Sequence, residues 1–143
     1  MLKDFLKERI TVIDTAATWQ EAIEIAAKPL LEEQAINESY LAAMIQNVID
    51  NGSYIVIVPG FAMPHARPET GVFKNGLSFL KLQKPVLFPE EKEVRVMIVL
   101  AACDSEWHLD LMGELSEILM EDEIMNQLFN ADSKEAVLNI FGS

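Results

Sequence analysis

Cysteine is nearly absent from this chain of 143 residues, which contains only Cys103. A single thiol cannot form a disulfide within the chain, so the fold must depend on its own hydrophobic core. No apolar run approaches the ~20 residues that a membrane-spanning helix needs. The first residues, MLKDFLKERITVI, mix charged and apolar side chains and lack the apolar centre of a signal peptide. We therefore expect a cytoplasmic protein with no direct insertion into a membrane.

Positive charge is also scarce. The formal net charge is −12, and no lysine or arginine lies between Lys28 and Arg67. Nucleic-acid binding depends on lysine and arginine side chains that neutralise phosphates, so the composition argues against a nucleic-acid partner. An acidic surface favours encounter with a basic partner. The alternative interpretation is that the acidic side chains only keep the protein soluble.

The first half of the chain predicts two helices. Thr18 and Glu21 form a capping-box pattern at the start of the first helix, and Pro29 should end or kink that helix. Asn37 is a suitable N-cap for the second helix, and Gly52 is a suitable residue to end it.

Three apolar segments then predict strands. Residues 54–58 form a continuous run typical of a buried strand, residues 77–82 alternate, and residues 94–102 are apolar over most of their length. Helical patterns follow near Asp104–Ser105, over 123–129 and after Asp132–Ser133. This order predicts a single α/β domain over residues 1–143, with a sheet covered by helices.

The stretch VPGFAMPHARPE, residues 58–69, contains one of only two histidines. Pro64 fixes one backbone angle and removes a donor, and Gly60 permits a tight turn just after the strand. Arg67 is a planar cation suited to bidentate contact with phosphate. A rigid loop at a strand end is a usual place for function, which makes His65 a candidate site residue. The alternative is a surface-loop histidine beside a turn.

The second histidine, His108, lies just inside a predicted helix that follows an apolar strand. Helix N-termini at strand ends are where anions bind in α/β folds. His108 shares a helix face with Leu111 and Leu115, so it should point toward the body of the domain. Taken alone, it could be a half-buried core histidine. If the two preceding strands are neighbours, both histidines belong to one site.

Several site chemistries lack their sequence pattern. The histidines are far apart in the chain and no HxxxH or CxxC is present, so a zinc site is not indicated even with Cys103 nearby. There is no GxSxG, no P-loop and no GxGxxG, so nothing indicates a serine hydrolase, ATP or NAD. We expect no cofactor and no metal. A histidine nucleophile that accepts a phosphoryl group and passes it on remains.

The segment GFAMPHARPE resembles the phosphorylation signature of the enzyme IIA domains of the bacterial phosphotransferase system (PTS), mannitol–fructose type. Pro64–His65 matches its centre. The second histidine, in SEWHLDLMGELSEIL, is also similar to the family pattern. The resemblance spans nearly the whole chain. Within the family, VPG before the signature and TWQEA near the start are most similar to the ascorbate-specific branch.

The resemblance implies a fold and a function. Family members are single α/β domains with a mixed sheet flanked by helices on both faces. It implies that His65 accepts a phosphoryl group from the phosphocarrier protein HPr, and that His108 stabilises the phosphoryl group or the transition state. The acceptor is then a cognate IIB component, which serves sugar uptake, ascorbate among the candidates, through the membrane component IIC.

One departure concerns the charge at the site. Many mannitol-type members have an arginine on the helix before the signature, where this chain has Asn47. Arg67 is the candidate replacement, and its alternative role is a surface ion pair with Glu69. Two other functions stay open at this point. One is a regulatory IIA protein of the nitrogen-related kind, and the other is a metal- or anion-binding module that uses both histidines.

Overall fold

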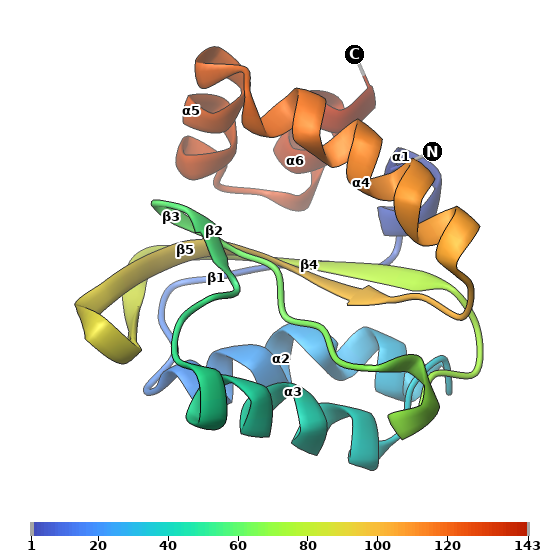
Figure 1. Cartoon of the computed structure of the whole chain (residues 1–143). Helices are drawn as coiled ribbons and strands as arrows, with labels where there is room; N and C mark the ends of the chain where they lie inside the picture. Colours follow the sequence, from blue (N-terminus) through green and yellow to red (C-terminus); the bar gives the residue numbers. More distant parts are fainter. Residues whose placement is uncertain (1, 143) are drawn as a thin grey trace.

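The computed structural model describes residues 2–142, which form a five-stranded sheet between two layers of helices (Figure 1). The strand order is β1-β4-β5-β3-β2. β4 pairs antiparallel with β5 and β3 with β2, whereas β1 runs parallel to β4 and β3 parallel to β5. The sheet is therefore mixed, and its strands are β1 (Ile10–Ile13), β2 (Val56–Val58), β3 (Gly60–Ala62), β4 (Gly76–Phe88) and β5 (Lys92–Ala101).

Helices cover both faces of this sheet. α2 (Trp19–Glu32) and α3 (Glu38–Asn51) lie on one face. The other face is covered by α1 (Leu2–Leu6), α4 (Ser105–Leu119), α5 (Asp122–Asn130) and α6 (Lys134–Gly142). Short 3₁₀ helices η1 (Pro68–Thr70) and η2 (Pro89–Glu91) interrupt the loops. The predicted α/β class, with a mixed sheet flanked on both faces, is confirmed.

The predicted helix caps are present. The side chains of Thr18, Asn37 and Asp104 each accept a hydrogen bond from the backbone N–H three residues on, at 3.1, 3.0 and 2.7 Å. Such a cap satisfies one of the donors that a helix N-terminus leaves unpaired. Pro29 does not end its helix, which continues to Glu32. At this position the missing N–H removes only one bond from the last turn.

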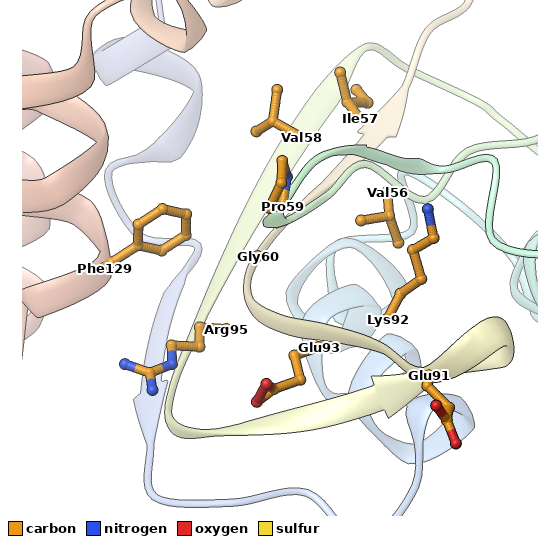
Figure 2. Close-up of a pocket in the computed structure, with 10 residues that line it drawn as sticks. All are labelled: Val56, Ile57, Val58, Pro59, Gly60, Glu91, Lys92, Glu93, Arg95 and Phe129. Carbon is orange, nitrogen blue, oxygen red and sulfur yellow. The ribbon is translucent and has the colours of Figure 1, made fainter.

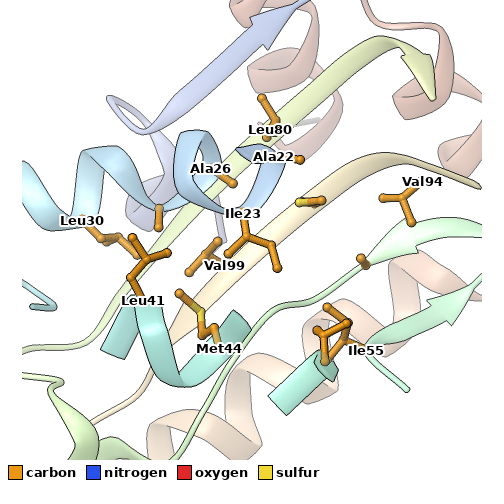
Figure 3. Packing of buried hydrophobic residues seen from close by; sticks show 14 of the residues in the cluster. Ala22, Ile23, Ala26, Leu30, Leu41, Met44, Ile55, Leu80, Val94 and Val99 are labelled. Carbon is orange, nitrogen blue, oxygen red and sulfur yellow. The ribbon is translucent and has the colours of Figure 1, made fainter. Parts of the chain in front are cut away.

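Each helical layer has its own hydrophobic core against the sheet. On the face of α2 and α3 (Figure 3), the sheet contributes Leu80, Met97 and Val99. On the opposite face it contributes Phe79 and Ile98 among others. β5 is therefore buried on both faces through most of its length, as its continuous apolar sequence predicts. Replacing one such buried side chain by alanine typically lowers the free energy of unfolding by about 2–5 kcal/mol. β5 is therefore a firmly held strand, and the segments that bond to it are held with it.

The buried strand predicted over 54–58 is wrong in two respects. β2 has only three residues and lies at the edge of the sheet, where Tyr54 and Ile57 are exposed. A tight turn then reverses the chain into β3, a strand that the sequence did not indicate, with Gly60 at φ +87°. A Cβ at Gly60 would meet the ring of Phe129 at 3.0 Å, so the turn needs glycine for both reasons.

The search for membrane-spanning helices covered the same described residues. None of the helices there has the length and apolar character needed to cross a bilayer.

Candidate functional site

His65 lies in the segment that leaves the carboxyl end of β3. The backbone N–H of Leu100 donates to the carbonyl of Pro64 at 3.1 Å, so the contact between β3 and β5 continues beyond the end of β3. The N–H of Met63 donates to the carbonyl of Ile55 at 2.9 Å on the other side. Pro64 is buried, while His65 is half-buried. The histidine is therefore presented at the surface from a segment bonded on two sides.

The imidazole of His65 has one defined hydrogen bond. Its Nδ1 lies 2.7 Å from the carbonyl oxygen of Met63. A carbonyl oxygen can only accept, so Nδ1 carries a proton, and in the neutral form of the ring the free lone pair is then on Nε2. Among the described residues, no hydrogen bond engages Nε2. The ring of Tyr54 stands edge-on to the imidazole, with the ring centroids 6.1 Å apart.

Side chains of α3 bind the backbone next to the imidazole. The hydroxyl of Tyr40 accepts from the N–H of Ala66 at 3.0 Å and donates to the carbonyl of Leu100 at 2.6 Å. The amide of Asn47 donates to the carbonyl of His65 at 3.3 Å. The sequence analysis did not assign either side chain to the site. For Asn47 the signal in the sequence was its place where many mannitol-type members have an arginine, and for Tyr40 it was the hydroxyl, which needs a partner when the ring is buried.

His108 lies in the first turn of α4, which follows β5, and is half-buried. β3 and β5 are parallel neighbours, so the segments that bear the two histidines leave the sheet at the same end. Leu111 and Leu115 on the same helix are buried against the sheet, in agreement with the predicted orientation of α4. No hydrogen bond within the described residues joins the two imidazoles.

Arg67 is exposed and precedes η1. Its carbonyl accepts from the N–H and the hydroxyl of Thr70, at 3.1 and 2.6 Å. Among the ion pairs of residues 2–142, none joins its guanidinium to Glu69. Arg67 therefore does not form the alternative surface ion pair with Glu69 among these residues, and its side chain is exposed.

The N-terminus of α4 already holds a carboxylate. Asp104 accepts from the N–H of Trp107 at 2.7 Å and from the amide of Asn75 at 3.3 Å. These hydrogen bonds, the one from Trp107 foremost, lower the pKa of Asp104. A negative charge at this end of the helix competes with a phosphoryl group for the same N–H groups. The side chain of His108, rather than the helix N-terminus itself, is then the group on α4 that can approach an anion.

The residues that the structure describes contain no group of three or more His, Cys, Asp or Glu side chains that could hold a metal ion. Cys103 is exposed, and its backbone N–H donates to the side chain of Asn75 at 2.6 Å. The metal-binding alternative therefore has no arrangement of ligands to support it within residues 2–142.

A pocket of about 560 Å³ lies at the other end of β3, around the Pro59–Gly60 turn (Figure 2). Phe129 of α5 lies on one side, residues 56–60 line another, and the remaining lining is the charged side chains of Glu91, Lys92, Glu93 and Arg95. His65 and His108 do not line it. The two histidines, each half-buried, therefore lie apart from this pocket.

Comparison with known protein families gives one match over almost the whole chain. The family described as phosphoenolpyruvate-dependent sugar phosphotransferase system, EIIA 2, matches residues 4–143. The chain belongs to this family. It is therefore a phosphotransferase component of the sugar phosphotransferase system, and the family resemblance seen in the sequence is confirmed.

Curated relatives come from both sugar branches. The mannitol-specific cryptic phosphotransferase enzyme IIA component of Escherichia coli K12 is 41% identical over 97% of this chain and 96% of its own length. The ascorbate-specific EIIA component of the same strain is 33% identical over 97% and 94%. The relatives therefore include the ascorbate branch, although the mannitol-type relative is the more identical of these two.

Solved structures have the same fold. The solution structure of the mannitol-specific cryptic enzyme IIA of E. coli superposes with a TM-score of 0.91 at 40% identity, over 97% of this chain and 96% of that one. A mannitol enzyme IIA of E. coli, solved in complex with phosphorylated enzyme IIB, gives a TM-score of 0.80 at 26% identity, over 94% of each chain.

The buried hydroxyl of Tyr40 predicts a loss of stability at alkaline pH. Burial raises its pKa to about 12, whereas tyrosine in an unfolded chain titrates near 10. Between these values the unfolded state loses the proton and the folded state keeps it. Tyr40 should therefore lower the free energy of unfolding by about 2–3 kcal/mol as pH rises from about 10 to 12.

Urea denaturation at several pH values in this range measures the effect. Tyr40→Phe should remove this part of the pH dependence. Ser78→Ala, which also loses a buried hydroxyl but no titrating group, should keep it. Equal pH slopes for the chain and Tyr40→Phe would contradict the prediction.

Proposed function

We propose that His65 is the phosphoryl acceptor and that this chain, acting as one IIA domain over residues 1–143, carries the group from HPr to a IIB component. The observation that supports this most strongly is the hydrogen bond between Nδ1 of His65 and the carbonyl of Met63. It leaves Nε2 as a neutral nucleophile at the surface. The proposal names Nε2 as the nitrogen that forms the bond to phosphorus.

The transfer step needs little besides geometry and charge. The lone pair of Nε2 attacks the phosphorus of the donor phosphohistidine, and the donor's P–N bond breaks with its electron pair returning to the donor ring. Phosphoryl transfer requires the attacking and leaving atoms to be in line. The imidazole gains positive charge as the bond forms, and the carbonyl of Met63 stabilises that charge through the proton on Nδ1.

His108 and Arg67 are proposed to stabilise the phosphoryl oxygens. His108 follows the strand next to β3 and is half-buried, and the guanidinium of Arg67 has no ion-pair partner within residues 2–142. Hydrogen bonds from a cation to an anion are about twice as strong as neutral ones. Asn47 stands where many mannitol-type members have an arginine, and it donates to the carbonyl of His65 instead, so Arg67 supplies the missing charge.

The partners follow from the charge and the family. The net charge of −12 favours a basic donor surface, as proposed for HPr, and a fast, weak encounter suits a relay. The acceptor is proposed to be a IIB component that serves a membrane component IIC, and the chain itself is proposed to work in the cytoplasm. The family relatives named for ascorbate and for mannitol make these two branches the sources of the cognate IIB.

The first prediction of this function is that His65 is labelled. Incubation with phosphoenolpyruvate, enzyme I and HPr should add one acid-labile phosphate, seen by intact mass, and His65→Ala should abolish it. Asp110→Asn, an exposed change on α4, is the control and should be labelled normally. A label on another side chain would show that His65 is not the acceptor.

The second prediction concerns onward transfer. His108→Gln should slow transfer from the labelled chain to IIB by about 10- to 100-fold, the equivalent of one charge-assisted hydrogen bond, and should affect labelling less. Transfer is followed by quenched-flow with IIB components of the ascorbate and mannitol branches. Unchanged rates would remove His108 from the reaction. A chain of the nitrogen-related regulatory kind, which takes its phosphate from a paralogue of HPr, would transfer to neither IIB.

The third prediction tests the cation. Arg67→Ala should reduce the rate of labelling by HPr about tenfold or more, and Arg67→Lys should recover part of that loss. Arg95→Ala is the matched control, because Arg95 is an exposed arginine that lines the pocket at the other end of β3. If both alanine variants lose the same activity, the effect is general electrostatic attraction and not contact with the phosphoryl group.

A further inference from the structure

We propose that Tyr40 is a positioning residue for His65, because its buried hydroxyl ties the segment that carries the imidazole to β5. The part of this inference that concerns rate rests on the proposed function. The part that concerns the orientation of the imidazole does not.

The hydrogen bonds around Tyr40 form a closed arrangement. Its hydroxyl accepts from the N–H of Ala66 at 3.0 Å and donates to the carbonyl of Leu100 at 2.6 Å. The N–H of Leu100 donates to the carbonyl of Pro64 at 3.1 Å. The residues on both sides of His65 are therefore bonded to Leu100, one directly and one through the hydroxyl. The carbonyl of Ala66 also lies 3.3 Å from the hydroxyl oxygen, but a phenol has a single proton, so the shorter contact identifies the carbonyl of Leu100 as its acceptor.

Burial makes this arrangement costly to break. The side chain of Tyr40 is 1% exposed, and Leu100 is likewise buried in β5. Removing the hydroxyl leaves the N–H of Ala66 and the carbonyl of Leu100 without this partner, and a polar group that is left unsatisfied away from water destabilises the arrangement. The N–H of Ala66 can then find a new hydrogen-bond acceptor only if the backbone around His65 moves toward another protein group or toward water.

Such movement changes the imidazole itself. The bond from Nδ1 to the carbonyl of Met63 selects the tautomer that leaves Nε2 unprotonated, and it depends on how residues 63–66 are held. Asn47 holds the carbonyl of His65 at 3.3 Å, a longer contact than those of Tyr40. Tyr40 thus controls both the direction of Nε2 and the tautomer, although it does not touch the reacting atoms.

The test compares Tyr40→Phe with Ser78→Ala. Both remove a buried hydroxyl that donates to a backbone carbonyl, but Ser78 on β4 bonds to Ala26 of α2 and not to the site. With phosphorylated HPr as donor, Tyr40→Phe should be labelled about 10- to 100-fold more slowly, the penalty expected for a misplaced reacting group. Ser78→Ala should stay within about twofold of the unchanged chain, because its reacting groups keep their geometry.

Two measurements on the unphosphorylated protein separate positioning from general loss of stability. The ¹⁵N shifts of His65 should show a proton on Nδ1 in the chain and in Ser78→Ala, and a mixture of tautomers in Tyr40→Phe. Hydrogen exchange of the amides of Ala66 and Leu100 should accelerate in Tyr40→Phe alone. If Tyr40→Phe does not fold, 3-fluorotyrosine placed at residue 40 keeps the ring and weakens the oxygen as an acceptor, and a smaller change of the same sign is expected.

The outcomes are distinguishable. An unchanged tautomer, unchanged exchange and an unchanged rate in Tyr40→Phe would overturn the positioning role. A chain that HPr never labels would overturn the proposed function, while the shifts and the exchange rates would still decide whether Tyr40 orients His65.

Discussion

The parallel pairing of β3 with β5 is the constraint on which the site depends. Only three residues form β3, with Phe61 opposite Val96 and Ala62 opposite Met97. The bond from Leu100 to Pro64 extends this contact to the residue before His65. Because the strands run in the same direction, the segments that carry His65 and His108 emerge at one end of the sheet. An antiparallel pairing would have separated the two histidines by the length of the strands.

The position of the imidazole depends on both helical layers. β5 is buried between the two cores, so Leu100 is a fixed point in the sheet. α3 lies on one face and reaches the segment around His65 with Tyr40 and Asn47. α4 lies on the other face and carries His108. Packing errors in either layer would therefore displace one histidine relative to the other, which ties the geometry of the site to the whole core.

Local signals in the sequence were sufficient for the starts of α2, α3 and α4, because a cap at Thr18, Asn37 or Asp104 involves only the next three residues. β1 and β3 are short and exist through pairing with strands far away in the chain, so no local pattern indicated them. The alternation over 77–82 correctly indicated a strand, which is part of β4, but helices cover both faces of β4 and bury Lys81, whose ammonium donates to the carbonyl of Ala131 at 3.0 Å. His65 and His108 were predicted from rare residue types after apolar segments, and the structure places both segments at one end of the sheet. Tyr40 was missed because, in the sequence, it is one more large side chain on a helix.

The absence of lysine and arginine from the sequence between Lys28 and Arg67 would suit the relay proposed for His65. A carrier must hold the phosphoryl group no more tightly than the next carrier does, because binding energy spent on the stable intermediate raises the barrier to leaving it. Asn47 is neutral, the N-terminus of α4 is occupied by the carboxylate of Asp104, and no lysine or arginine precedes Arg67 back to Lys28. Within the segment that carries His65, an exposed arginine is then the single fixed cation available. In the proposed relay, screening by solvent keeps the attraction of this exposed arginine weak, so the phosphoryl group would be stabilised enough to arrive and not enough to stay.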